Sequence, residues 1–201
     1  MGERAILVTF GERIEPHLNA RARALADAWE SAGLGPAIPS YASTLLHYDP
    51  LRVTRARAVV LARSLAHRRA RARRDGRVIE IAVRYDGPDL AEVARLSSLE
   101  IDELIEAHSR VVYRAYFLGF MPGFAYLGET DTRIVAPRLS EPRLRVPPGS
   151  VAVAGRQTAV YPFASPGGWR LIGSTDVTPF DARRDPPVLI REGDRVRFTP
   201  R

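Results

Sequence analysis

Residues 117–128 read FLGFMPGFAYLG, an apolar run that is interrupted by glycine and proline. Comparable clusters recur at 146–151, 154–158 and 161–173, and no helical periodicity is found beyond residue 109. Short runs rich in β-branched and aromatic residues, which favour strands, cover 111–117, 150–154, 158–161, 169–172, 187–190 and 195–198. Many short strands separated by turn residues predict a β-barrel for the C-terminal half of the chain.

The N-terminal half has a different pattern, in which strand-like runs alternate with helix-like ones. The predicted elements are a strand at 5–10, a helix from 16 to 33, extended pieces at 37–41 and 44–48, a helix from 50 to 74, and a strand at 78–85. This β-α-β-β-α-β order is typical of a ferredoxin-like α/β sandwich, a four-stranded sheet with two helices on one face. We therefore expect an α+β protein with a ferredoxin-like domain at 1–86, followed at 87–201 by a helical connector and a β-barrel.

The connector begins at Gly87 and is expected to contain two short helices. Asp89 with Glu92, and Ser97 with Glu100, have the spacing of a capping box. In a capping box two side chains bind the free backbone N–H groups at a helix start. Each pair therefore predicts the beginning of one helix.

Composition excludes several kinds of chemistry. The 201-residue chain has no cysteine and no lysine, which excludes disulfides, thiolate nucleophiles, a P-loop lysine and a Schiff base. The four histidines, His17, His47, His67 and His108, show no metal-ligand spacing, so no metal site is expected.

The basic charge of the chain raises the question of a nucleic-acid partner. The net charge is +7 and the pI is about 10.5. We expect no such partner, because the arginines are spread along the chain and the arginine-rich run at 68–74 is interpreted as a solvated helix end. No apolar run approaches the roughly 20 residues of a membrane span, and no secretory signal pattern is found, so a cytoplasmic protein without a membrane partner is expected.

Aromatic residues gather at the glycine- and proline-rich turns, although loop tips in a plain scaffold are usually small and polar. With nearby arginine and glutamine they predict a small-ligand pocket that has apolar walls and a few polar anchors. The predicted walls are Phe120, Phe124, Tyr126 and Trp169, the close-approach glycines are Gly123, Gly167 and Gly168, the anchors are Arg138, Arg145 and Gln157, and Pro122, Tyr161 and Ser165 complete the substrate-binding set. The alternative is that these aromatics only fill the corners of a barrel core.

His108 is a further candidate, but its position has two interpretations. It ends an apolar stripe that Ile101, Leu104 and Ile105 form on the second connector helix. A core or interdomain histidine is the favoured interpretation, and proton transfer by the imidazole is the alternative. No catalytic residue is assigned.

Several motifs occur in a fixed order along the chain. They are 46–51 (LHYDPL), 119–127 (GFMPGFAYL), Ala136-Pro137-Arg138, Glu141-Pro142-Arg143, 146–151 (VPPGSV), 155–158 (GRQT) and 165–173 (SPGGWRLIG). Together they closely resemble the family that contains the sporulation kinase A inhibitor, the B subunit of bacterial 5-oxoprolinase and allophanate hydrolase subunit 1. The resemblance covers nearly the whole chain.

The resemblance implies a small N-terminal α/β domain followed by a cyclophilin-like β-barrel. It also implies a non-autonomous B subunit, inactive alone, in a complex that uses ATP to convert 5-oxo-L-proline to L-glutamate. The implied partners are the C subunit (allophanate hydrolase subunit 2) and the A subunit of that complex. ATP is used by the assembled complex, and no cofactor is expected on this chain.

Two alternative functions stay open from the sequence. One is a regulatory inhibitor of a sensor histidine kinase, and the other is a component of allophanate or urea-type amide metabolism. One departure bears on specificity, because the family usually continues with Arg-Thr-Pro after Gly173, whereas this chain has Ser174-Thr175-Asp176. The substrate specificity depends on whether the missing arginine contacts an anionic substrate or partner.

Overall fold

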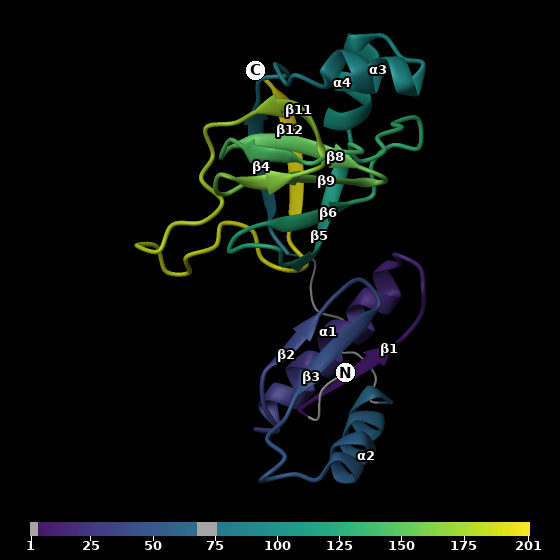
Figure 1. Cartoon of the computed structure of the whole chain (residues 1–201), viewed down its shortest axis with the longest axis vertical. Coiled ribbons are helices and arrows are strands. Elements are labelled where there is room, and N and C mark those ends of the chain that lie inside the picture. The colour runs from purple at the N-terminus through teal and green to yellow at the C-terminus, as the bar shows by residue number, and fades with distance from the viewer. Residues whose placement is uncertain (1–3, 68–75) are drawn as a thin grey trace. The chain divides into compact units, whose positions relative to one another are not determined.

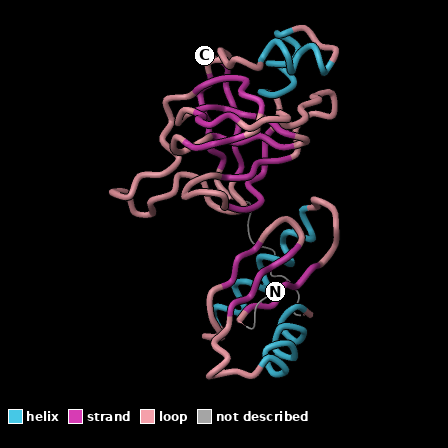
Figure 2. Tube along the Cα trace, viewed as in Figure 1, coloured by secondary structure: helices cyan, strands magenta, loops and turns pink. Residues whose placement is uncertain are grey.

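The computed structural model describes residues 4–67 and 76–201. The chain divides into two compact units, Met1–Arg74 and Asp75–Arg201. Figure 2 shows helices and strands together in the first unit and a strand-rich second unit. No helix in the described ranges is both long and apolar enough to cross a membrane.

The first unit is a three-stranded antiparallel sheet with two helices (Figure 1). Its elements are β1 (Ala5–Thr9), α1 (Pro16–Ser31), β2 (Ala37–Pro39), β3 (Ser43–His47) and α2 (Arg55–Ala66), with the strand order β1-β3-β2. As predicted, Pro16 opens α1, and Gly33 follows its end with φ +67°. Leu25, Trp29 and Leu46 lie in one buried core with the apolar side of α2.

Helix α2 begins later than the sequence predicts. Asp49 and Pro50 precede it in a turn, and Thr54 is its N-cap, with a side chain that accepts a hydrogen bond of 3.4 Å from the backbone N–H of Arg57. The predicted continuation of this helix through 68–74 lies outside the described residues.

The second unit is built on a seven-stranded sheet with the order β11-β8-β9-β6-β5-β12-β4. Its elements are β4 (Val78–Val83), α3 (Leu90–Ser97), α4 (Ile101–Ser109), β5 (Val112–Leu118), β6 (Ala125–Gly128), β7 (Arg143–Val146), β8 (Ser150–Ala154), β9 (Gln157–Val160), β10 (Ser165–Gly167), β11 (Arg170–Ser174) and β12 (Arg195–Pro200). An antiparallel bridge between Arg84 and Ser174 joins the two edges of this sheet. The predicted β-barrel is therefore confirmed as a nearly closed sheet, with β7 and β10 pairing as a separate two-stranded sheet.

Strand β4 corrects the prediction for the N-terminal half. It was expected to be the fourth strand of a ferredoxin-like sandwich at 1–86, but it pairs in parallel with β12 inside the barrel sheet, with Ile81 opposite Phe198. Both side chains are almost fully buried in the barrel core. The ferredoxin-like sandwich is therefore not confirmed, because the described part of the first unit contains a sheet of three strands.

The two connector helices exist, but neither of the predicted capping boxes forms. Glu100 and Glu103 form the capping box of α4, whereas the Ser97 hydroxyl accepts a hydrogen bond of 2.9 Å from the backbone N–H of Val135. Asp89 is the N-cap of α3, but its side chain makes no capping bond. In Figure 1 both helices lie at one end of the barrel.

The predicted strand at 187–190 is also wrong. This segment belongs to the long connection between β11 and β12, which Figure 2 shows extending from the barrel, and its only bridge in the described structure joins Val188 to Phe180. Three short strands, β6, β7 and β10, were not predicted; each follows a connection that contains proline.

Candidate functional site

A cavity of about 220 Å³ opens on the barrel unit where the glycine- and proline-rich loops meet. The loops that form it precede and follow β6, β7 and β10, which brings together residues that are distant in the sequence. Its lining consists of Phe120, Phe124, Tyr126, Arg138, Pro142, Tyr161, Pro166, Gly167, Gly168 and Trp169. We call this the aromatic pocket.

Phe124 is the centre of the aromatic pocket. Its buried ring makes edge-to-face contacts with Phe120, Tyr126, Tyr161 and Trp169, at centroid distances of 5.4, 5.0, 5.3 and 5.6 Å. Edge-to-face geometry is the favoured arrangement for aromatic pairs. The five rings therefore pack as one cluster that forms the walls of the pocket.

Phe120 stands at the exposed side of this cluster in a strained backbone conformation. Its φ is +68°, which is rare for a bulky residue, and 61% of its surface is exposed. The next residue, Met121, donates its backbone N–H to the Gly119 carbonyl over 2.8 Å, and the Phe124 N–H reaches the Met121 carbonyl over 3.1 Å. Strain that is held in place by such bonds is characteristic of ligand-binding loops.

Arg138 supplies the positive charge of the pocket. Its guanidinium lies 5.9 Å from the centroid of the Trp169 ring, within the range of a cation–π contact. The segment is anchored next to the arginine, because the Leu139 N–H donates to the Gly168 carbonyl over 2.8 Å. Within the described chain, the Arg138 side chain has no hydrogen-bond or ion-pair partner, so its N–H groups are available to an anion.

Two tyrosines add hydroxyl groups to the lining. Burial raises the pKa of Tyr126 and of Tyr161, and the nearby Arg138 opposes the rise in both. Both phenols are therefore protonated near neutral pH and can donate hydrogen bonds. Gly167 is required beside them, because a Cβ at this position would lie 2.5 Å from the Tyr161 hydroxyl oxygen.

Eight of the predicted substrate-binding residues line this pocket, and five do not. Gly123 is buried against Phe180, where a Cβ would lie 2.7 Å from the Phe180 Cβ, and its neighbour Pro122 is exposed outside the lining. Gln157 lies on β9 and Ser165 on β10, and each has a buried polar side-chain atom without a hydrogen-bond partner among the described residues. Arg145 lines a different cavity.

Two residues of the lining, Pro142 and Pro166, were not predicted. Both stand beside glycines or arginines in the motifs that the sequence analysis singled out. Their signal was present in Glu141-Pro142-Arg143 and Ser165-Pro166-Gly167, but a proline alone is equally well explained by a turn.

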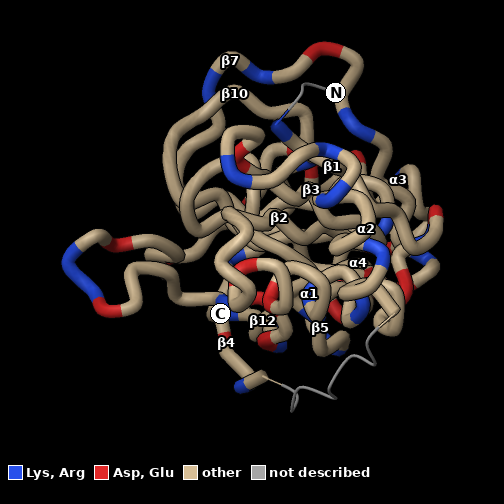
Figure 3. Tube along the Cα trace, turned by 90° about the horizontal axis from the view of Figure 1, so that it is seen from below, with Lys and Arg blue, Asp and Glu red and all other residues tan. Residues whose placement is uncertain are grey.

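The second cavity of the barrel unit, of about 310 Å³, includes charged and hydroxyl side chains in its lining. Arg143 and Arg145 of β7 contribute to its lining, and Figure 3 shows basic residues along this strand. The Arg143 guanidinium donates to the Asp89 carboxylate over 2.7 Å, and the other Asp89 oxygen accepts from the Leu171 N–H over 2.6 Å. This ion pair fixes β7 to the start of α3 and to β11.

Residues 174–176, where the chain departs from the usual family sequence, lie at the edge of this cavity. Asp176 accepts two hydrogen bonds from Arg84, at 2.9 and 2.8 Å, and one from Arg201 at 2.7 Å. Ser174 donates to the Asp86 carboxylate over 3.0 Å. The side chains of this segment thus bind groups of the chain itself.

His108 lies outside both cavities, in the interior of the barrel unit. It is fully buried, and its ring stacks on Phe198 with centroids 4.7 Å apart. Burial lowers the pKa of its imidazole to about 3, so the ring is neutral near pH 7. This position agrees with the favoured interpretation of a core histidine.

Comparison with known proteins places this chain in a defined family. The family described as "Carboxyltransferase domain, subdomain C and D" matches residues 1–190, and the chain belongs to this family. Within it, the chain is 39% identical over 215 residues to the B subunit of 5-oxoprolinase from Bacillus subtilis, covering 98% of this chain and 90% of the relative. A protein of the same name from Escherichia coli O157:H7 is 53% identical over 129 residues, which are 63% of this chain and 59% of the relative.

Solved structures with a similar fold include two at more than 40% identity. TTHA0988 has a TM-score of 0.87 at 44% identity, over 98% of this chain but 40% of that protein. The conserved uncharacterized protein PH0987 from Pyrococcus horikoshii has a TM-score of 0.61 at 43% identity, over 100% of this chain and 95% of that one. The Kluyveromyces lactis urea carboxylase, at 16% identity and a TM-score of 0.78, shares the fold over 98% of this chain and 21% of its own length.

Proposed function

We propose that this chain is the B subunit of an ATP-dependent 5-oxoprolinase, which converts 5-oxo-L-proline to L-glutamate only when its partner subunits are present. Its family membership and its relatives, which carry the name of the 5-oxoprolinase B subunit, support the proposal. The observation that carries it is the Arg138 guanidinium beside the aromatic pocket, which has no hydrogen-bond or ion-pair partner among the described residues. The barrel is proposed to be of the cyclophilin-like type, which implies no prolyl isomerase activity.

The chemistry of 5-oxoproline matches the groups in this pocket. The molecule is a small lactam ring with one carboxylate, so its ring faces suit the aromatic walls around Phe124. Its carboxylate suits the Arg138 guanidinium, which can form two parallel hydrogen bonds to a planar anion. The largely apolar lining strengthens such a charged contact relative to water.

Opening the lactam places negative charge on its carbonyl oxygen. Hydrogen-bond donors that already point at this oxygen stabilise the charge as it develops. The protonated hydroxyl groups of Tyr126 and Tyr161 are hydrogen-bond donors in the pocket lining. We propose that they orient the lactam carbonyl, while Arg138 holds the carboxylate.

The remaining chemistry is assigned to the partner subunits. None of the residues described as lining the pocket carries a carboxylate, and the sequence offers neither lysine nor cysteine as a nucleophile. We therefore propose that ATP is bound by the assembled complex, through its A and C subunits, and that this chain holds no cofactor of its own. We propose a cytoplasmic complex, because ATP is available in that compartment.

Exposed apolar side chains near the pocket are the proposed contact with the C subunit. Phe120, Leu144 and Phe163 are 61%, 92% and 41% exposed, and they lie on the loops and strands that surround the lining. Aromatic and other apolar residues of this kind are enriched in protein interfaces. The same side chains would serve a kinase-binding regulator, which keeps inhibition of a sensor histidine kinase as the second candidate function.

Reconstitution from purified subunits distinguishes these functions. ATP hydrolysis and glutamate formation are measured with 5-oxoproline for this chain alone, for the A and C subunits without it, and for the mixture. The proposal predicts turnover in the mixture only. If no combination turns over 5-oxoproline, the same assay with urea-type amides and a kinase autophosphorylation assay decide between the two alternatives.

A further inference from the structure

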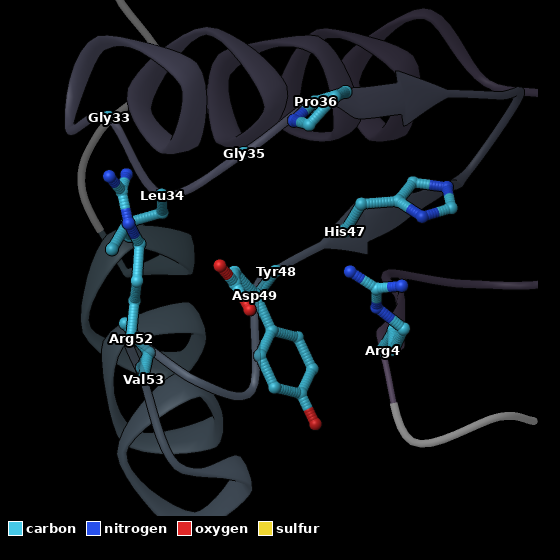
Figure 4. A pocket seen from close by; sticks show the side chains of 10 residues that line it. All are labelled: Arg4, Gly33, Leu34, Gly35, Pro36, His47, Tyr48, Asp49, Arg52 and Val53. Atoms are coloured by element: carbon cyan, nitrogen blue, oxygen red, sulfur yellow. The ribbon is translucent and has the colours of Figure 1, made fainter.

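The first unit contains a cavity of its own, of about 440 Å³, which the proposed function does not use. It lies between the loop that follows α1 and the segment that joins β3 to α2, with Arg4 at one side (Figure 4). Its lining consists of Arg4, Gly33, Leu34, Gly35, Pro36, His47, Tyr48, Asp49, Arg52 and Val53. Tyr48 and the side chains of Leu34 and Val53 provide its apolar part.

The frame of this cavity is fixed by backbone hydrogen bonds. The Tyr48 N–H donates to the Arg4 carbonyl over 3.0 Å, and the His47 N–H donates to the Pro36 carbonyl over 2.9 Å. The Trp29 indole donates to the His47 carbonyl over 2.9 Å. Gly35 is required at the loop, because its φ is +139° and a Cβ there would clash with the same carbonyl. The charged side chains therefore project from a built frame.

Three charged side chains face this cavity. Figure 4 shows the guanidinium groups of Arg4 and Arg52 on opposite sides of Asp49. Neither guanidinium has a hydrogen-bond or ion-pair partner within 4–67 and 76–201. One Asp49 carboxylate oxygen accepts the Leu51 N–H over 3.0 Å, which orients the group and leaves its second oxygen open. The cavity thus offers two separated cations with one oriented carboxylate between them.

We propose that this cavity binds an acidic amino acid, with its two carboxylates on Arg4 and Arg52 and its ammonium group on Asp49. Such a ligand carries two negative charges and one positive charge, the complement of the three side chains. Arginine pairs with carboxylates through two hydrogen bonds, and each pair restores the solvation that the guanidinium loses on binding. If, as the proposed function holds, the chain belongs to a 5-oxoprolinase, L-glutamate is the reaction product and the cavity is a product-binding site.

Other small anions match the three charges less well. Inorganic phosphate could bridge the arginines but would face the Asp49 carboxylate, and like charges at short range are unfavourable. Glutarate lacks the ammonium group, and L-glutamine lacks the second carboxylate. 5-Oxoproline has one carboxylate and a neutral lactam nitrogen, so it leaves both Asp49 and one arginine without a partner.

Isothermal titration of the isolated chain, without ATP and without partner subunits, tests the proposal. L-glutamate is expected to bind more tightly than glutarate, L-glutamine, 5-oxoproline and inorganic phosphate. Arg52→Gln should weaken glutamate binding roughly 10- to 100-fold, because a hydrogen bond to a charged group is lost. Arg57→Gln, an exposed change on α2 outside the lining, is the matched control, and circular dichroism checks that each variant folds.

The Asp49→Asn variant separates recognition of the ammonium group from folding. Asparagine keeps the side-chain oxygen that accepts the Leu51 N–H, so the turn should stay intact. Glutamate binding should weaken in this variant, whereas glutarate binding should be equal or stronger. The proposal is overturned if the wild-type chain does not bind glutamate, if glutarate or phosphate binds as tightly, or if Arg52→Gln has no effect. Because this titration uses no partner or ATP, its failure leaves the reconstitution assay unaffected.

Discussion

His108 Nε2 lies 2.9 Å from Thr158 Oγ1 in the interior of the barrel unit. The Thr158 hydroxyl donates its single hydrogen to the Ala152 carbonyl over 3.0 Å, so Nε2 must be the donor to Thr158. The other ring nitrogen, Nδ1, then accepts from the Tyr85 hydroxyl over 2.8 Å. One neutral tautomer of His108 therefore joins α4 to β9 and to the end of β4.

The buried position of His108 makes stability depend on pH. The folded imidazole has a pKa of about 3, whereas an unfolded histidine titrates near ~6.5. Because the unfolded chain binds a proton that the folded chain does not bind, the stabilisation is complete above pH ~6.5 and is lost as pH falls toward 3. We expect the free energy of unfolding to fall by about 1.4 kcal/mol per pH unit between pH 6 and 5.

Urea unfolding at intervals from pH 7.5 to 5 measures this dependence. Carboxylates contribute little in that window, because their unfolded pKa values lie near ~4. His108→Gln should flatten the curve. An equal slope in the His108 variant and the wild type would show that another group is responsible.

The ion pair between Asp89 and Arg143 is expected to stabilise the barrel unit. Asp89→Ala removes an acceptor from both Arg143 and the Leu171 N–H, and both donors are left in a poorly solvated region. The expected loss is about 1.5–3 kcal/mol in the free energy of unfolding, the usual range for hydrogen bonds to charged groups. The exposed pair Arg197–Glu80 provides the control, since Glu80→Ala should cost less than ~1 kcal/mol. Similar losses in the two variants would contradict the assignment.

The barrel could be predicted from the sequence, but the sheet to which β4 belongs could not. Alternating apolar and glycine-rich runs identify short strands locally, and most of those predicted beyond residue 109 are present. Val78–Val83 pairs with a strand more than a hundred residues later. Periodicity shows that a segment is extended but carries no information on its partner, so the order of elements suggested the wrong sheet.

The lining of the aromatic pocket could be predicted at positions where the residue type is unusual for a turn. Exposed aromatics such as Phe120 do not belong at plain turns, and they mark the site. Gln157 does not line the aromatic pocket, because it lies on β9, where its side chain is directed by the strand register. Arg145, on β7, lines the second cavity of the barrel unit instead, and no sequence signal assigns a strand residue to one cavity or another.

The Phe120→Asn change should weaken substrate binding while it changes the stability of the chain little. Asparagine tolerates the left-handed region far better than phenylalanine, so Phe120→Asn removes strain of ~1 kcal/mol while it removes an exposed ring. We expect the free energy of unfolding to change by less than ~1 kcal/mol, while the KM for 5-oxoproline in the reconstituted complex rises roughly two- to tenfold. Phe124→Ala, at the buried centre, should instead cost about 3–5 kcal/mol. A large loss of stability in Phe120→Asn would refute the assignment of strain.

The carboxylate contact of Arg138 is the most direct test of the central claim that the aromatic pocket holds 5-oxoproline. Steady-state kinetics of glutamate formation should be measured in the reconstituted complex with wild-type chain, Arg138→Gln, Arg138→Lys and Arg197→Gln. The last is a control at an exposed arginine that pairs with Glu80 on the barrel surface. We predict that Arg138→Gln raises the KM for 5-oxoproline roughly 10- to 100-fold, that Arg138→Lys restores part of the loss, and that Arg197→Gln matches the wild type. An unchanged KM in Arg138→Gln would contradict the account and place the substrate elsewhere in the complex.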